Sequence, residues 1–303
     1  MRLRPLLHAL AFVILILPAA ARAAPAVLVT IKPVHALVAG VMAGVGKPDL
    51  LIGGGLSEHS YALKPSDAAE IAGAKVVFWI GPDLETTLSG PLANLAGDAK
   101  VVALEDTPGL RRLRARPGGL WSGKPPASGP INPHVWLDPQ NAIAMTRAIA
   151  AALSAADPAD AARYAANAKA QIDRLAALDK RLARMLAPVR ARPFIVFHDA
   201  YPYFDTRYGL NAIGAVTVEP DRPVGPRRVA QLRDALKSGK AVCIFREPQF
   251  TPALIDAVAA GTKARVGVLD PLGADLPPGP GLYPALMERM AGALVQCLAP
   301  QAP

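Results

Sequence analysis

DPQNAIAMTRAIAAALSAADPADAARYAANAKAQIDRLAALDKRLARMLAPV, residues 138–189, is the stretch that decides the fold class. It is rich in alanine, contains no strand-like run, and apart from the prolines next to its two ends is interrupted only by Pro158. Asp157 is a suitable N-cap, and Pro158 suits the first position of a helix of about 30 residues, or about 45 Å. We expect a helix over 157–189 that stiffly connects two lobes. The alternative is an ordinary pair of core helices within one domain.

Short apolar runs alternate with helical patterns on both sides of this segment. Runs rich in β-branched residues predict strands at 26–31, 49–53, 75–80 and 100–104 before it, and at 193–198, 212–218, 241–247 and 265–270 after it. Continuously apolar strands that alternate with helices are typical of parallel sheets covered on both faces. We therefore expect an α/β protein of two lobes, each with a mostly parallel sheet flanked by helices.

The expected domain boundaries follow from this alternation. The N-terminal lobe spans 24–156, the connecting helix 157–189 and the C-terminal lobe 190–303. Within the first lobe, residues 106–132 are rich in glycine, proline and arginine, which predicts a flexible surface loop. This loop is basic, with Arg111, Arg112, Arg114, Arg116 and Lys124.

The first 23 residues have the layout of a secretory signal peptide. Arg2 and Arg4 precede the apolar run ALAFVILIL (9–17), and small residues then lead to Ala23. The apolar run is much shorter than the ~20 residues that a membrane span needs. We expect cleavage after Ala23 and export of the chain. Because no cysteine stands at the cut, we do not expect a lipid anchor.

Composition argues against a nucleic-acid-binding protein. The chain has 303 residues and a formal net charge of +9, which falls to +6 when the three arginines of residues 1–23 are removed. The remaining positive charges are scattered and aromatic residues make up only 5% of the chain. Nucleic-acid-binding surfaces usually cluster their basic residues.

Two cysteines, Cys243 and Cys297, are candidates for a disulfide because an exported chain meets an oxidising compartment. Such a bridge would stabilise the fold by about 4 kcal/mol in the chain-entropy model. The alternative is a pair of buried free thiols. Zinc ligation by these cysteines is not expected, because neither has a CxxC or Cys-His neighbour.

Three histidines stand where parallel α/β proteins bind their ligands. His198 ends the expected strand 193–198, His59 follows the strand 49–53 in a loop, and His134 lies just before a helix start. Asp270 ends the strand 265–270. Since ligands bind beyond the carboxyl ends of parallel strands, these side chains can converge between the lobes. His35, in the middle of a helical pattern, is expected to be structural.

Three imidazoles with a carboxylate suit Zn²⁺ in a tetrahedral shell, with Zn–N distances of ~2.0–2.1 Å. Manganese prefers more oxygen ligands, whereas copper and nickel also accept imidazole. A zinc hydrolase is a rival interpretation, with an open fourth position and Glu58 as the general base. Against it, Asp270 would close the shell, and the chain contains no HExxH motif.

The motifs around these residues resemble a known family. The stretches are IKPVHALVAGVMAGVG (31–46), GGLSEHSYALKPSDAAEI (54–71), VVFWIGPDLE (76–85), NPHVWLDPQNA (132–142), FIVFHDAYPYFDTRYGL (194–210), CIFREPQFTPALI (243–255) and VGVLDPLG (266–273). They resemble, in the same order, motifs of the periplasmic zinc-binding proteins of ABC-type zinc uptake systems. These are the ZnuA-type members of the cluster A-I metal-binding family.

The resemblance implies two α/β lobes, a long connecting helix and one metal ion in the cleft between the lobes. By motif position, His59, His134 and His198 match the metal ligands, and Asp270 matches the acid of the second lobe. Glu58 matches an acid beside the first histidine, and either replaces Asp270 as the fourth ligand or caps the open side. Histidine at position 198 resembles the zinc members, because the manganese members generally carry glutamate there.

The resemblance also implies the biological role. The chain is expected to be a monomeric periplasmic protein, not an enzyme, that carries Zn²⁺ to an ABC permease in the inner membrane. Manganese is the alternative cargo. Cys243 and Cys297 match the disulfide of the zinc members. One departure is the loop 106–132, which lacks the histidines that zinc members often carry there. A second weak metal site is therefore not expected, and capture of chelated zinc or transfer from a chaperone is a hypothesis.

Overall fold

The computed structural model describes residues 24–121, 127–218, 220 and 223–300. The expected signal peptide, its cleavage site and Lys124 lie outside these residues. Within them, each helix is too short or too polar to cross a membrane.

The first sheet is parallel and its central strands are buried. It consists of β1 (Val27–Ile31), β2 (Asp49–Ile52), β3 (Val76–Trp79) and β4 (Lys100–Ala103), in the order β2-β1-β3-β4. Every residue of β1 and β3 is buried, which explains their unbroken apolar sequences. The helical elements of this lobe are α1 (Lys32–Val41), α2 (Pro65–Gly73), η1 (Thr86–Leu88), α3 (Ser89–Leu95) and η2 (Leu104–Asp106).

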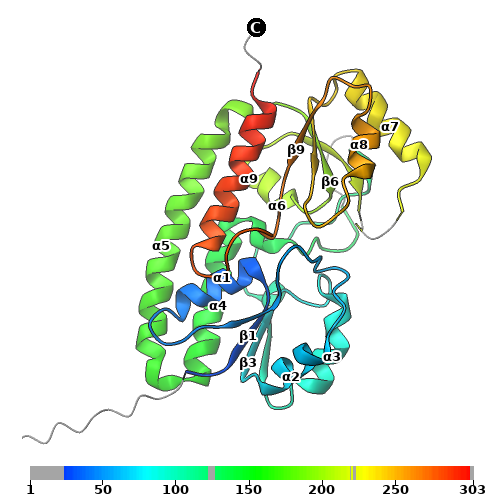
Figure 1. Ribbon diagram of the computed structural model, residues 1–303. Coiled ribbons are helices and arrows are strands. Elements are labelled where there is room, and N and C mark those ends of the chain that lie inside the picture. Colours follow the sequence, from blue (N-terminus) through cyan, green and yellow to red (C-terminus); the bar gives the residue numbers. More distant parts are fainter. Residues whose placement is uncertain (1–23, 122–126, 219, 221–222, 301–303) are drawn as a thin grey trace, which may run out of the picture.

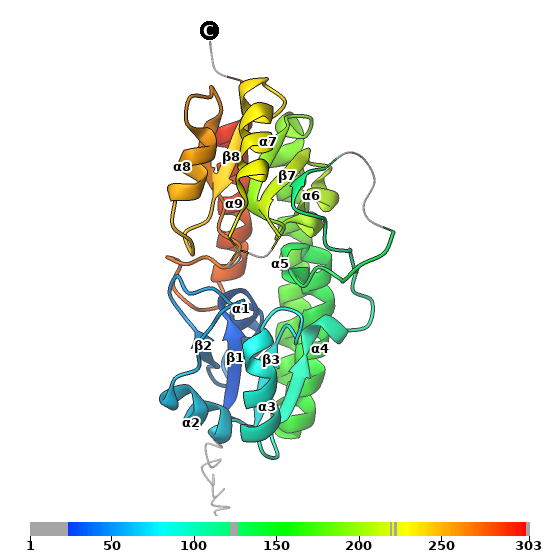
Figure 2. The ribbon, with the colours of Figure 1, turned by 90° about the vertical axis from the view of Figure 1, so that its right-hand side faces the viewer.

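The second sheet is parallel apart from one short edge strand. It consists of β5 (Gly119–Leu120), β6 (Phe194–His198), β7 (Ala212–Thr217), β8 (Cys243–Arg246) and β9 (Arg265–Val268), in the order β5-β7-β6-β8-β9. Its helices are α6 (Pro202–Tyr208), α7 (Pro226–Lys237), α8 (Ala253–Ala259) and α9 (Leu282–Leu298). Figure 2 shows the two sheets one above the other, with α4 and α5 running along one side. The prediction of two α/β lobes is confirmed.

A continuous helical segment joins the lobes (Figure 1). It consists of η4 (Pro158–Asp160), α5 (Ala161–Leu186) and η5 (Ala187–Val189). Two elements precede it in the chain, η3 (Val135–Leu137) and α4 (Pro139–Ala156). Its buried residues recur every three or four positions, so one face packs on the protein. Asp157 precedes the segment but makes no side-chain cap; its carboxylate accepts a hydrogen bond from Tyr164 Oη at 3.1 Å.

The basic loop 106–132 contains one element that its sequence did not suggest. β5 pairs antiparallel with β7, although β5 precedes the connecting helix and β7 follows it. Gly214 makes this pairing possible, because a Cβ there would lie 2.7 Å from the carbonyl oxygen of Gly119. The loop is therefore attached to the second sheet.

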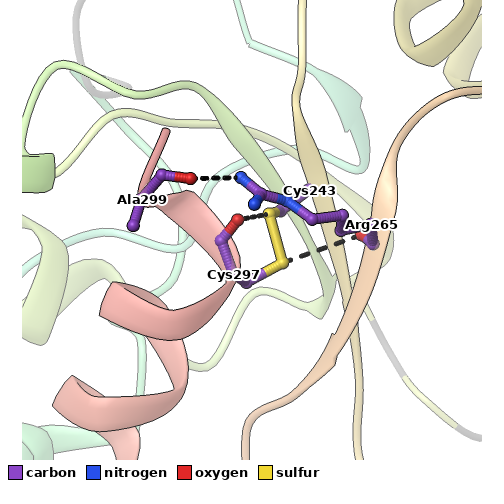
Figure 3. The surroundings of a disulfide bond; sticks show 4 residues. All are labelled: Cys243, Arg265, Cys297 and Ala299. Carbon is purple, nitrogen blue, oxygen red and sulfur yellow. Dashed lines mark hydrogen bonds between the residues drawn. A yellow bond between two sulfur atoms is a disulfide. The ribbon is translucent and has the colours of Figure 1, made fainter. Parts of the chain in front are cut away.

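The last helix, α9, is tied to the second sheet by a disulfide. Cys243 in β8 and Cys297 in α9 form the bridge, as expected (Figure 3). Beside it, the guanidinium of Arg265 donates a hydrogen bond to the carbonyl oxygen of Ala299 at 2.7 Å. These contacts hold the carboxyl end of α9 against the edge of the sheet, while α9 also packs along α5.

Side chains that precede the connecting helix hold a loop of the second lobe. Lys32 Nζ donates to the carbonyl oxygens of Gly273 at 2.6 Å and Ala274 at 2.9 Å, and Lys32 is only 4% exposed. Trp136 Nε1 donates to the carbonyl oxygen of Pro271 at 2.9 Å. The loop that follows β9 in the second lobe is thus held by residues of the first lobe.

Candidate metal centre

The three predicted histidines meet, although they come from three distant segments. His59 lies in the loop between β2 and α2, His134 immediately precedes η3, and His198 is the last residue of β6. Nε2 of His134 lies 3.3 Å from Nε2 of His59 and 3.1 Å from Nε2 of His198. The three ligand atoms all lie within 4.8 Å of one another, so this group can hold a metal ion.

These separations match the edge of a zinc tetrahedron. With Zn–N bonds of ~2.0–2.1 Å, two nitrogens of one tetrahedral shell lie ~3.3 Å apart. His134 and His198 are 2% exposed, whereas the side chain of His59 is 19% exposed. The three nitrogens therefore already lie close together, and His59 is the histidine of the cluster that contacts solvent.

Hydrogen bonds at Nδ1 aim two of the rings. His134 Nδ1 lies 3.0 Å from Oδ1 of Asn132, and His198 Nδ1 lies 2.6 Å from Oε2 of Glu247. Both partners are acceptors, so each ring places its proton on Nδ1 and keeps the lone pair of Nε2 for the common centre. Glu247 is in turn held by Tyr201 Oη, which donates to Oε1 at 3.0 Å.

Burial keeps two of the rings neutral. It lowers the pKa of His59 to about 3 and the pKa of His134 well below its usual value, and the neighbouring charge of His198 adds to both shifts. Burial also lowers the pKa of His198, but the charge and hydrogen bond of Glu247 outweigh it and the net shift is upward. Near neutral pH, His198 is therefore the ring of the three that competes most strongly for a proton.

The two candidate carboxylates differ in what surrounds them. Oε1 of Glu58 lies 3.8 Å from Nε2 of His59 and 3.9 Å from Nε2 of His134, is buried, and accepts no hydrogen bond from the described residues. Burial raises the pKa of Glu58 to about 7. A buried acceptor without a donor is costly, and a cation at the centre of the cluster would satisfy it.

Asp270 is not part of the histidine group. Its Oδ1 accepts from the backbone N–H of Leu272 at 3.0 Å and of Gly273 at 2.9 Å, and its Oδ2 accepts from Ala274 N at 2.6 Å. Gln249 Nε2 also donates to Oδ1 at 2.8 Å. The carboxylate thus organises the loop after β9, the same loop that Lys32 contacts.

Two residues of the site, Glu247 and Asn132, were missed in the sequence. Glu247 directly follows β8, so the rule that placed His198 and Asp270 at strand ends could have found it. Asn132 belongs to the NPH motif, but an uncharged amide is not a usual metal ligand, so the sequence did not single it out. His35 is structural as expected, with Nε2 3.0 Å from the carbonyl oxygen of Pro48.

The family model described as zinc-uptake complex component A, periplasmic (ZnuA), matches residues 27–297. The chain belongs to this family. The match includes all three histidines, both candidate carboxylates and the disulfide.

Named relatives resemble the chain over most of its length. The high-affinity zinc uptake system protein ZnuA of Brucella abortus (strain 2308) is 45% identical, over 90% of this chain and 91% of the relative. The protein of the same name from Yersinia pestis is 35% identical, over 91% and 92%. A crystal structure of a ZnuA deletion mutant with zinc bound superposes with a TM-score of 0.79 at 27% identity and covers 92% of this chain and all of that one. The similarity thus extends from sequence to the two-lobed fold.

Proposed function

We propose that this protein binds one Zn²⁺ ion reversibly in the periplasm and delivers it to an ABC permease in the inner membrane. The observation that carries the proposal is the meeting of three imidazole Nε2 atoms at the separations of a zinc shell. The names of the relatives, and the bound zinc of one solved structure, support the same cargo. Three nitrogen ligands also favour zinc over manganese.

In this proposal Glu58 is the fourth ligand. Its unpartnered Oε1 already lies beside His59 and His134, whereas the oxygens of Asp270 are occupied by four donors. A shell closed by Glu58 has no open position for an attacking water, which a zinc hydrolase needs. The ion is then cargo, and the protein's task is to hold it and release it.

The rest of the role follows from the family and the sequence. The signal peptide is cut after Ala23, and residues 24–303 act as a monomer in the periplasm. The connecting helix limits the motion between the lobes, so the permease releases zinc by disturbing the ligand shell. His59, the most exposed ligand, is the ring through which such a disturbance reaches the ion.

Metal analysis of the untagged mature protein tests the proposal. Residues 24–303 are stripped of metal and offered equal Zn²⁺ and Mn²⁺, and the bound metal is counted per chain. Binding of Ni²⁺ and Cu²⁺ is measured separately, because copper binds nitrogen ligands more tightly than zinc does. The expected result is one zinc ion per chain, lost in the variant His134→Ala. Preferential retention of manganese, or zinc retention unaffected by the His134 substitution, would contradict it.

A further inference from the structure

Residues 113–121, called the strap here, lie across the second lobe. At one end the strap pairs with the chain that leads to His134, through Asn132 N donating to Leu113 O at 2.8 Å and Ala115 N donating to Pro130 O at 3.0 Å. At the other end, Trp121 N donates to Ile213 O at 2.8 Å beside the β5–β7 pair. The strap therefore contacts both the segment before His134 and the second sheet.

Arg116 occupies the middle of the strap and binds two buried acids. Its backbone N donates to Oδ2 of Asp199 at 2.6 Å, and its Nε donates to Oδ1 of Asp199 at 2.7 Å. Its Nη2 donates to Oδ2 of Asp205 at 2.9 Å. The two carboxylates are only 2% and 5% exposed, and both form their ion pairs in the described part of the chain with Arg116. The Trp121 ring lies 3.7 Å from the guanidinium and covers it.

Asp199 links this arginine to two of the histidines. It directly follows His198 in the chain, and its backbone oxygen accepts from Nδ2 of Asn132 at 2.5 Å. Oδ1 of the same Asn132 accepts from Nδ1 of His134. A shift of Asp199 would therefore move His198 through the backbone and His134 through Asn132.

We propose that Arg116 is a positioning residue of the zinc site, which holds His198 and His134 at ligand separation by clamping Asp199 and Asp205. This inference rests on the proposed zinc-binding function. Without the guanidinium, two buried carboxylates lie close together with no cation, so the pair takes up a proton or water, or the segment 199–205 moves apart, and the bonds that fix Asp199 are lost in each case. Metal sites tolerate displacements of only about 0.5 Å, and loss of a group that orients the ligands typically lowers metal affinity by about 10–100-fold.

The variants Arg116→Ala and Arg116→Lys test the clamp in the mature protein. Lysine keeps the positive charge but lacks the planar guanidinium whose several N–H groups bond both acids. We therefore expect a loss of zinc affinity smaller than that of Arg116→Ala. Arg114→Ala is the matched control, because Arg114 lies in the same strap, is exposed, and donates to the backbone oxygen of Gly129. The readouts are the zinc dissociation constant by competition with a chelator, the visible absorption spectrum with Co²⁺, and the melting temperature without metal.

The expected result is a zinc affinity about 10–100-fold lower in Arg116→Ala, a smaller loss in Arg116→Lys, and an altered Co²⁺ spectrum in both. Arg114→Ala should match the unsubstituted protein. If Arg116 only stabilised the fold, melting would change while the affinity and Co²⁺ spectrum of the folded protein stayed the same, and this outcome would overturn the inference. Should Arg116→Ala fail to fold, Arg116→Lys decides by the same criteria. Failure of the unsubstituted protein to bind zinc would instead refute the proposed function.

Discussion

Nδ1 of His198 lies 2.6 Å from Oε2 of Glu247, which directly follows β8, the strand paired with β6. Glu247 fixes the orientation of the ring and raises the pKa of His198 against the opposing effect of burial. Zinc must displace a proton from Nε2 of this ring and, below about pH 7, a proton from Glu58 as well. Affinity should therefore be constant where both groups are unprotonated, fall about tenfold per pH unit where one of them is protonated, and fall about a hundredfold per unit where both are.

The substitution Glu247→Gln separates the two effects of this carboxylate. Above the pKa, the glutamine variant should bind zinc about 10–100-fold more weakly, because the imidazole is a poorer ligand and is less well oriented. The pH at which affinity begins to fall should move downward, since the charge that raises the pKa of His198 is gone. Competition titrations from pH 5 to pH 9 measure the affinity and the pH at which it begins to fall. Superimposable profiles for the two proteins would show that Glu247 neither orients His198 nor raises its pKa.

Glu58 and Asp270 should respond differently to substitution. Glu58→Gln is expected to reduce zinc affinity by at least about tenfold, because a charged ligand is lost. Asp270→Asn should mainly lower the free energy of unfolding, by about 1–3 kcal/mol, since its amide cannot accept from Ala274 N. Zinc titration and urea unfolding of both variants distinguish the roles. A loss of zinc affinity confined to Asp270→Asn would identify Asp270, and not Glu58, as the fourth ligand.

Glu58 should also make the metal-free protein less stable as pH rises. Burial raises the pKa of Glu58 from 4.5 to about 7, so the folded state holds a proton that the unfolded state has released between these values. Stability from this group is lost as pH climbs through that window. Glu58→Gln should therefore match the unsubstituted protein in melting temperature at pH 4 and exceed it at pH 8, both without metal. An equal difference at both pH values would show that the charge of Glu58 is not responsible.

Lys32 should stabilise the contact between the lobes. Lys32→Met keeps the apolar stem but leaves the carbonyl oxygens of Gly273 and Ala274 without this donor. We expect a loss of about 1–3 kcal/mol in the free energy of unfolding, measured in urea. Lys169→Met is the control, because Lys169 is exposed and forms a surface pair with Asp173. Equal effects of the two substitutions would show that the contact contributes little.

Gly40 should be essential for the packing of α1 on α5. A Cβ at Gly40 would lie 1.6 Å from Oε1 of Gln171, whose Nε2 donates to Leu37 O at 3.0 Å. Gly40→Ala is therefore expected to destabilise the protein by about 1–3 kcal/mol. Gly73→Ala, at the end of α2, has no heavy atom within 4 Å of the new Cβ and should be close to neutral. Thermal unfolding of both variants measures the difference, and a tolerated Gly40→Ala would contradict the packing argument.

The local patterns of the sequence predicted the strands of the two sheets, with the exception of β5. β1 and β3 are unbroken apolar runs because both faces of a central parallel strand are covered, and that requirement is visible in the residues themselves. The alanine-rich segment likewise predicted the connecting helix. The strand-end rule and the motifs identified His59, His134 and His198 as candidates, since the carboxyl ends of parallel strands share one edge.

Only the tertiary structure decided which polar groups face one another. The sequence pointed to Asp270 as the carboxylate of the site, with Glu58 as the alternative fourth ligand. In the structure, backbone N–H groups occupy Asp270, whereas Oε1 of Glu58 lies beside the histidines without a hydrogen-bond partner among the described residues. The clamp of Arg116 on Asp199 spans 83 residues of sequence, so no local pattern could show it. Hydrophobic periodicity is set by the local backbone and is readable along the chain. The pairing of donors, acceptors and charges depends on contacts between distant segments, and these exist only once the chain has folded.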